Sequence, residues 1–400
     1  MELSELEALL TPEGLRLLDA MAPVDSSDDV ARAVTRLRRD GHSPELVSAV
    51  VGQARLRTRA RAKFGDFADR MLFTRAGLEQ ATRLSIAARH AARFRDAGFV
   101  HVADLGCGIG GDALGLAGLG LRVTAVDADE VTAGIAAYNL APFGTDVEVR
   151  HGSAQDTDLA GIDAVWLDPA RRTAGHTETS RTRPDDWSPS LDWVLEVARR
   201  LPTGVKLGPG LDRELIPDDV EAQWVSADGS TVELVLWSGA LAREGVRRAA
   251  LVIRSDGGEG ARAHELTADT DAADEPAREL GAYLHEPDGA VIRARLIGDV
   301  ARSLEAGMLD EHIAYLTSDA ALTSPFVSTF RVREVLPADV KALSKALRER
   351  DIGRLEIKKR GVDVDPAVLR PRLKLRGSES ATLLLTRIGN RRTAILADRV

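Results

Sequence analysis

The sequence predicts an α/β fold whose mostly parallel sheet is preceded by a helical region and followed by a small α+β domain. Three patterns predict it. Apolar residues recur at helical spacing over the first 95 positions, short apolar runs alternate with helix-like stretches from residue 100, and the last 70 residues mix both patterns. With 400 residues, of which 44% are hydrophobic and 29% charged, the chain is long enough for about two or three globular domains.

Residues 1–75 form the predicted helical region. Apolar positions three and four residues apart occur in Leu3–Leu10 and again in Val30–Leu37. The acidic stretch Asp25–Asp29 separates the two runs and supplies N-cap residues for the second.

Residues 76–245 form the predicted sheet domain. The alternation of strand-like and helix-like segments is typical of βαβ units with parallel strands. The expected strands are Val100–Leu105, Arg122–Asp127, Val147–Arg150, Ala164–Asp168 and Gly204–Leu207. Two further runs, Ala222–Ser226 and Thr231–Trp237, have no helix between them, and the intervening Asp228-Gly229-Ser230 predicts a hairpin turn. A sheet that ends in a hairpin differs from a symmetric dinucleotide-binding fold.

The rest of the chain divides into a connecting region, 246–327, and a C-terminal α+β domain, 328–400. In the connecting region, residues 256–280 are rich in Gly, Asp, Glu and Ala and predict a loop or weak strand. A helix around Ile292–Leu304 and a further segment, Tyr315–Phe326, follow. The C-terminal domain is predicted to contain helices at Ala338–Arg348 and Pro366–Leu369, strands at Phe330–Val335 and Leu355–Lys359, and a final hairpin-like pair at Thr382–Arg387 and Thr393–Leu396.

A glycine-rich loop follows the first predicted strand and opens a helix. Its sequence is Asp104-Leu105-Gly106-Cys107-Gly108-Ile109-Gly110, and glycines there let the backbone turn sharply and approach a ligand. Asp127 ends the next strand, where a carboxylate can accept hydrogen bonds from both hydroxyls of a ribose. Nicotinamide-binding loops share that second acid, but their pyrophosphate disfavours an acid at the position of Asp104. A ligand with an ammonium and a sulfonium group favours it.

This loop resembles the first motif of class I S-adenosylmethionine-dependent methyltransferases, and the hairpin-ended sheet is similar to their Rossmann-like sheet over roughly residues 76–240. The resemblance implies that S-adenosylmethionine is the cofactor. It further implies that Asp104, Gly106, Gly108 and Gly110 line its methionine part, that Asp127 holds the ribose, and that Asp156 lies near the adenine. Gln80 and Thr82 are candidate donors to the cofactor's carboxylate, although the polar face of an amphipathic helix explains them as well.

Asp168-Pro169-Ala170-Arg171-Arg172 follows the fourth predicted strand. The string is similar to the Asp/Asn-Pro-Pro motif of methyltransferases that act on nitrogen atoms of nucleic acid bases or of protein side chains. By that resemblance Asp168 and Pro169 are catalytic, with Asp168 accepting hydrogen bonds from the target amine. Ala170 replaces the second proline. Arg171 and Arg172 are candidates to hold a substrate phosphate or carboxylate, or to pair with a neighbouring helix.

The single cysteine limits the chemistry. Asp-Pro-x-Arg also resembles RNA methyltransferases that modify pyrimidine carbon 5, which need a cysteine nucleophile. Cys107 is the only cysteine and lies inside the glycine loop, so we exclude that substrate. The loop also resembles that of guanosine cap-hypermethylating enzymes, which indicates a guanine amine. The eight histidines show no ligand spacing, so no metal is expected.

The C-terminal residues carry a reversed charge. Residues 331–400 contain 18 Lys and Arg against nine Asp and Glu, whereas the whole chain has a net charge of -9. Ile357–Gly361 and Leu383–Ala397 resemble the THUMP-like domain of a bacterial family of class I methyltransferases, which implies an RNA partner, tRNA or rRNA. With only 4% aromatic residues, contacts are expected mainly to phosphates.

We therefore expect an S-adenosylmethionine-dependent methyltransferase acting on a base nitrogen of RNA. Two alternatives stay open: a methyltransferase for a protein or small molecule, and a noncatalytic RNA-binding protein that retains the fold. No apolar run approaches the roughly 20 residues that cross a bilayer, and the start of the chain is acidic, so a cytoplasmic location with no membrane partner is expected.

Overall fold

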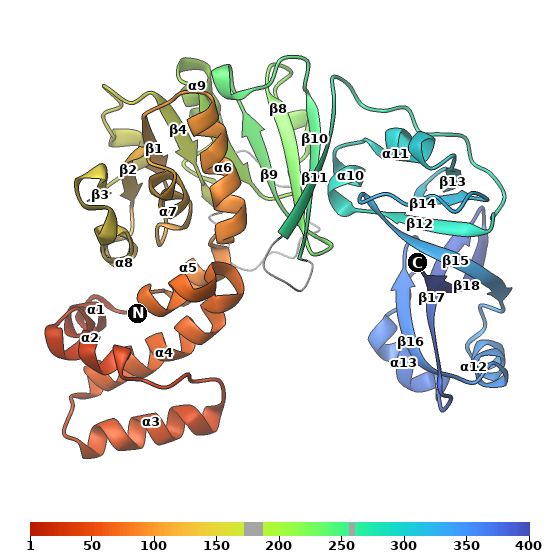
Figure 1. Ribbon diagram of the computed structural model, residues 1–400, viewed down its shortest axis with the longest axis horizontal. Helices are drawn as coiled ribbons and strands as arrows, with labels where there is room; N and C mark the ends of the chain where they lie inside the picture. Colours follow the sequence, from red (N-terminus) through yellow and green to blue (C-terminus); the bar gives the residue numbers. More distant parts are fainter. Residues whose placement is uncertain (172–186, 256–260) are drawn as a thin grey trace. The chain divides into compact units, whose positions relative to one another are not determined.

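The computed structural model describes residues 1–171, 187–255 and 261–400, and of Arg171 only the backbone. The described chain forms two compact units (Figure 1). The first contains residues 1–220 and 235–243, and the second contains 221–234 and 244–400. None of the described helices is both long and apolar enough to span a membrane.

The first unit begins with helices, as predicted. They are α1 (Leu3–Leu9), α2 (Pro12–Asp19), α3 (Ser27–Arg39), α4 (Pro44–Phe64), α5 (Arg75–Gln80) and α6 (Leu84–Asp96). The predicted stretch caps α3, but the N-cap is Ser26 rather than an acid: Ser26 and Asp29, at the third helical position, form a reciprocal capping box. Ser43 caps α4, whose first residue is Pro44.

A parallel sheet follows, with strands β1 (His101–Leu105), β2 (Arg122–Asp127), β3 (Val147–His151), β4 (Ala164–Leu167) and β7 (Thr203–Leu207). All five predicted strands are confirmed to within one residue at either end. Their order is β3-β2-β1-β4-β7, and each neighbouring pair is parallel. The connecting helices include α7 (Gly111–Gly118), α8 (Glu130–Leu140) and α9 (Leu191–Arg200). Because the chain reverses its direction across the sheet between β1 and β4, the loops after these strands flank a crevice at the carboxyl edge.

The predicted hairpin is confirmed and extends the sheet. It consists of β8 (Glu221–Ala227) and β9 (Ser230–Trp237), joined by Asp228 and Gly229 with φ angles of +51° and +81°. Positive φ angles at both residues are typical of two-residue hairpin turns, whose twist matches that of the flanking strands. The strand β9 belongs partly to each unit, and its C-terminal part lies next to β7.

The second unit contains two further strands beside this hairpin. Strand β10 (Arg248–Ser255), which was not predicted, runs parallel to β8, and β11 (Ala261–Ala268) runs antiparallel to β10. The prediction of a loop or weak strand over 256–280 agrees with the edge strand at 261–268. Half-buried and exposed residues alternate along β11 at the edge of the sheet. The strand is therefore held by backbone hydrogen bonds to β10 rather than by burial of apolar side chains.

The second sheet has seven strands in the order β13-β14-β12-β15-β18-β17-β16. They are β12 (Tyr283–Pro287), β13 (Gly307–Asp310), β14 (Ile313–Ser318), β15 (Val327–Leu336), β16 (Ile352–Lys359), β17 (Glu379–Ile388) and β18 (Arg391–Arg399), accompanied by α10 (Gly289–Arg293), α11 (Ile297–Ser303), α12 (Val340–Glu349) and α13 (Pro366–Leu373). The predicted helix over Ile292–Leu304 is divided in two, because Arg295 has a φ of +59°. The start of the predicted segment Tyr315–Phe326 lies in β14.

Two cores cover the faces of this second sheet. Along β17, Leu383 and Leu385 join the core beneath α12 and α13, while Leu384 joins the core on the other face with Tyr315 and Phe330. Side chains alternate between the faces of a strand, so a continuous apolar run is what a strand buried on both faces requires.

Candidate active site

The loop after β1 has a conformation that requires glycine. Gly106, Gly108 and Gly110 have φ angles of +88°, +55° and +87°, which other residues rarely adopt. A Cβ atom at Gly106 would lie 2.8 Å from the carbonyl oxygen of Asp168, whereas one at Gly108 would meet no atom within 4 Å. The loop therefore lies against the β4 loop at Gly106 and borders open space at Gly108.

Asp104, on β1, is a buried carboxylate without a hydrogen-bond partner among the described residues. The residue is 1% exposed, and neither side-chain oxygen accepts a hydrogen bond from any residue that the structure describes. Burial, reinforced by the carboxylates of Asp112 and Asp168, raises the pKa of Asp104 well above its ordinary range. Because buried polar groups normally have partners, this carboxylate fits a ligand that brings its own cation.

Two further acids follow neighbouring strands at the same edge. Asp127 ends β2, and its carboxylate accepts hydrogen bonds from the backbone N–H groups of Gly108 and Asp129, both at 2.9 Å. These bonds fix Asp127 beside the glycine loop. Asp156 is exposed and ends the single helical turn Ala154–Asp156 after β3. The expected contacts of the two acids, with the ribose hydroxyls and the adenine amine respectively, stay predictions from the family resemblance.

Lys206, on β7, connects Asp168 and Thr82, which were predicted as site residues, with Asp112, which was not. Its Nζ donates a 2.5 Å hydrogen bond to Asp168 Oδ2 and a 3.0 Å bond to Thr82 Oγ1. It also lies 3.9 Å from Asp112 Oδ2. The side chain of Lys206 is only 12% exposed and that of Asp168 is 33% exposed, so this ion pair is shielded from water on most sides.

Asp112, in the first turn of α7, is the buried end of this network. It accepts hydrogen bonds from Thr82 Oγ1 at 2.7 Å and from His90 Nδ1 at 2.9 Å. Burial opposes ionisation, but His90, the Lys206 ammonium and Thr82 outweigh it and hold the pKa of Asp112 below its ordinary value. The His90 ring, on α6, lies against the Trp166 ring of β4 with centroids 4.4 Å apart.

Two side-chain amides fix the backbone of residues 72 and 73 over the glycine loop. Gln53 of α4 exchanges two hydrogen bonds with the backbone of Phe73, at 2.7 and 3.0 Å. Asn139 of α8 accepts from Leu72 N at 2.7 Å and donates to the carbonyl oxygens of Leu72 and Ile109 at 3.0 and 2.9 Å. The helical region is thereby bound to the loop that faces the expected cofactor.

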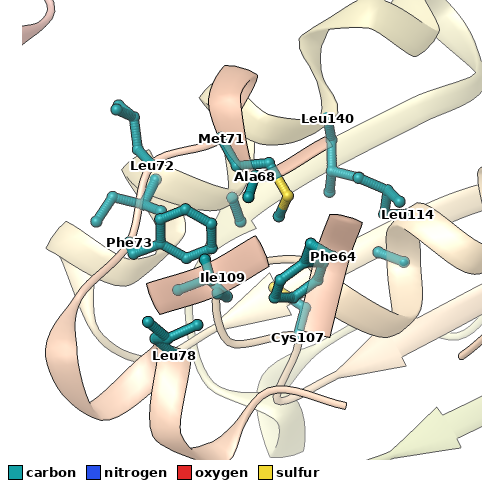
Figure 2. Packing of buried hydrophobic residues seen from close by; sticks show 14 of the residues in the cluster. Phe64, Ala68, Met71, Leu72, Phe73, Leu78, Cys107, Ile109, Leu114 and Leu140 are labelled. Atoms are coloured by element: carbon teal, nitrogen blue, oxygen red, sulfur yellow. The ribbon is translucent and has the colours of Figure 1, made fainter. Parts of the chain in front are cut away.

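Hydrophobic packing strengthens this attachment. Figure 2 shows Phe64, Phe73 and Leu78 of the helical region around Cys107 and Ile109 of the glycine loop, all within one buried cluster. Burial raises the pKa of the Cys107 thiol well above its ordinary value, so the thiolate needed for nucleophilic attack is strongly disfavoured.

The remaining predicted residues are dispersed. Thr82 is buried and belongs to the Lys206 network, whereas Gln80 is exposed at the end of α5. Pro169 is buried beside Asp168. The backbone of Arg171 pairs with Trp187 in a two-stranded ladder, β5 (Ala170–Arg171) with β6 (Trp187–Ser188). The side chain of Arg171 and the whole of Arg172 lie outside the described residues.

Three residues of the site were missed: Lys206, Asp112 and His90. A signal for the first two was present, because each is the only charged residue of a largely apolar element, β7 and α7 respectively. A charge in such a context is costly unless it is paired. His90 gave no comparable signal, because its partner is 22 residues away in the sequence.

Known proteins resemble the chain over nearly all its length. Two curated proteins of Mycobacterium tuberculosis, from strains CDC 1551 and H37Rv, are each described as an uncharacterized S-adenosylmethionine-dependent methyltransferase. Each is 35% identical over 367 residues, covering 88% of this chain and 95% of the relative. Residues 327–399 match the THUMP domain-like family, and residues 2–60 match a domain of unknown function.

A crystal structure of a candidate methyltransferase from Porphyromonas gingivalis W83 shares the fold. It aligns with a TM-score of 0.72 and 22% sequence identity, covering 94% of this chain and 99% of that chain. The shared architecture therefore includes the helical region and the C-terminal strands as well as the parallel sheet.

Proposed function

The chain belongs to the family of S-adenosylmethionine-dependent methyltransferases that includes its two mycobacterial relatives, and from this premise we propose that it methylates a base nitrogen of RNA. The observation that carries the proposal is Asp104, a buried carboxylate with no partner among the described residues, beside a loop whose glycines leave room for a ligand. A guanine amine is the acceptor that the resemblance of the loop favours.

The chain's own residues fit the cofactor group by group. Asp104 would accept hydrogen bonds from the ammonium, Asp127 from the ribose hydroxyls and Asp156 from the adenine amine. Gly108 would let the ligand approach the backbone, since no atom lies where its Cβ would be. When bound, S-adenosylmethionine supplies an electrophilic methyl group, and its sulfur retains the electron pair of the C–S bond that breaks.

Asp168 is the residue that would orient the acceptor. It follows β4 at the point where the strand order reverses, and its backbone carbonyl lies against Gly106. A carboxylate there would accept a hydrogen bond from the acceptor's N–H and so direct the nitrogen lone pair toward the methyl carbon. Such positioning can supply a large part of the rate enhancement without covalent catalysis.

The C-terminal domain offers one cationic surface suited to RNA phosphates. Many of its cations are paired with carboxylates; for example, Arg333 pairs with Asp398, Arg350 with Glu334 and Lys358 with Glu286. A second group, here called the 370–376 cluster, is exposed and forms no ion pair within the described residues: Arg370, Arg372, Lys374 and Arg376. Cations without carboxylate partners can neutralise RNA phosphates without first losing an internal ion pair.

The test is transfer of labelled methyl from S-adenosylmethionine to RNA extracted from a strain that lacks this gene. We expect label in RNA with the wild type and at least a tenfold lower rate, as an order-of-magnitude loss, with Asp168→Ala. Digestion to nucleosides then identifies the base. Asp163→Ala is the matched control, because Asp163 precedes the same strand at its opposite end and accepts hydrogen bonds from the backbone of residues 100 and 101.

Cofactor binding by calorimetry shows whether each variant is folded. If wild-type protein binds S-adenosylmethionine but labels only a protein or small-molecule fraction, the RNA part of the proposal is wrong. If it binds RNA and no cofactor, the noncatalytic alternative is correct.

A further inference from the structure

The Asp168 carboxylate, which would orient the acceptor, is held by a neighbouring lysine. Lys206 on β7 reaches across to Asp168 after the neighbouring β4, with 2.5 Å between Nζ and Oδ2. The same ammonium is held by Thr82 at 3.0 Å and by Asp112 at 3.9 Å. Because Thr82 and Asp112, from two other segments, hold Nζ, the ammonium restrains the position of Asp168 Oδ2 as well.

We propose that Lys206 is a positioning residue that keeps Asp168 ionised and aimed, and that the pair thereby restricts the acceptor to an uncharged, planar N–H group such as a nucleobase amine. The proposal rests on the proposed function and adds a requirement on the acceptor. A carboxylate has about four acceptor positions, so it can bind an acceptor N–H while Lys206 holds Oδ2.

The fate of the acceptor's N–H proton explains why the acceptor must be uncharged. When the acceptor nitrogen forms its bond to the methyl carbon, it becomes cationic and must lose one N–H proton. That proton passes to the Asp168 carboxylate and then to water, and the N–H electron pair stays on nitrogen. A carboxylate beside an ammonium is a weak base, which suffices for a protonated aromatic amine. It cannot deprotonate a lysine ammonium, whose ordinary pKa is about 10.4.

Several charges surround Asp168 in the described part of the chain. Lys206 faces it from β7, Asp104 lies on β1 and Asp112 begins α7; both acids are in electrostatic range of the pair. Lys63 of α4 is close enough to Lys206 for the two ammonium groups to repel. Lys206 is thus the cation in direct contact with Asp168 among these groups, and removing it takes away a positive charge that stabilises the ionised carboxylate.

The test is the pH dependence of kcat for RNA methylation at saturating S-adenosylmethionine, so that the titration of Asp104, which acts on cofactor binding, does not contribute. With Lys206→Met the acid limb is expected to move to higher pH by about one unit or more, because Asp168 then protonates more easily. Lys206→Arg retains the cation and should restore the limb. Lys206→Gln, a polar neutral residue, repeats the measurement if the methionine variant does not fold.

Arg61→Met is the control. It removes a cation–carboxylate pair in the first unit, with Asp69 at 2.8 Å, and should leave the acid limb of kcat in place. A purely structural role for Lys206 predicts an unshifted limb in Lys206→Met with a lower melting temperature. That result would overturn the inference while leaving RNA methylation by the wild type intact, whereas absence of RNA labelling by the wild type would refute the proposed function itself. Methylation of lysine-rich peptides by the wild type would also overturn the inference.

Discussion

At the scale of single residues, Asp104 combines a cost to folding with the proposed role in cofactor binding. Its folded-state pKa is raised by burial, so the native state holds its proton at pH values where the unfolded chain releases it. The carboxyl group therefore lowers the free energy of unfolding progressively as the pH rises above its ordinary pKa. An ammonium ligand reverses this cost, because it stabilises the ionised form.

We predict that Asp104→Asn raises the melting temperature of the ligand-free protein more at high pH than at low pH, and weakens S-adenosylmethionine binding by about tenfold or more, the usual scale for losing a hydrogen bond to a charged group. In the wild type, affinity should rise with pH through the titration of Asp104. Calorimetry in buffers of different ionisation enthalpy detects the proton released on binding. Affinity that is independent of pH and unaffected by the asparagine would contradict this role.

At the scale of elements, the glycine loop packs against the β4 loop at Gly106 and borders open space at Gly108. Substitutions at the two glycines therefore test packing and ligand binding separately. We predict that Gly106→Ala destabilises the protein by about 1–3 kcal/mol more than Gly120→Ala, because only the first adds a Cβ 2.8 Å from a backbone oxygen. Gly120 is the matched control: its φ is +83°, and a Cβ there meets nothing within 4 Å. Urea unfolding measures both.

Gly108→Ala should resemble Gly120→Ala in stability, since its Cβ also meets no protein atom. It should nevertheless weaken cofactor binding, because that Cβ occupies the space beside the loop. Unchanged affinity in Gly108→Ala would place the ligand elsewhere.

Elements defined by local pattern were predictable, and those defined by distant pairing were not. Strands β1 to β4 and β7 to β9 follow from apolar runs and the turn at Asp228 and Gly229, which are properties of consecutive residues. The edge strand β11 has no such signature. Likewise, Asp168 was found from its motif, but its partner Lys206 is 38 residues away. Only the parallel pairing of β4 with β7 brings the two side chains together.

At the scale of the whole molecule, the chain divides its charge between two tasks. The first unit contains the acids that suit a cationic cofactor, while residues 331–400 carry twice as many cations as acids. Within that segment, ion pairs such as Arg350 with Glu334 neutralise part of the excess. The 370–376 cluster is exposed and has no ion pair among the described residues, so its charge is available to RNA phosphates.

We predict that replacing all four residues of the 370–376 cluster with glutamine weakens binding of the full chain to cellular tRNA and rRNA and reduces the salt dependence of the affinity. For every phosphate that the variant no longer neutralises, the slope of log affinity against log salt should fall by roughly 0.7 to 0.9. The α3 cluster (Arg36, Arg38 and Arg39) is the control, since it too is an exposed group of arginines at the end of a helix. Fluorescence anisotropy across a salt series measures both variants.

The comparison separates a binding surface from the general preference of helix C-termini for cations, which both clusters satisfy. If glutamine at the 370–376 cluster and at the α3 cluster weakens RNA binding equally, positive charge acts without a defined surface. If only the α3 variant weakens it, the RNA contacts the helical region. A third outcome is weaker RNA binding in the 370–376 variant alone, with unchanged affinity for S-adenosylmethionine. It would show that RNA and cofactor bind to separate groups of side chains and that the two binding free energies are not coupled.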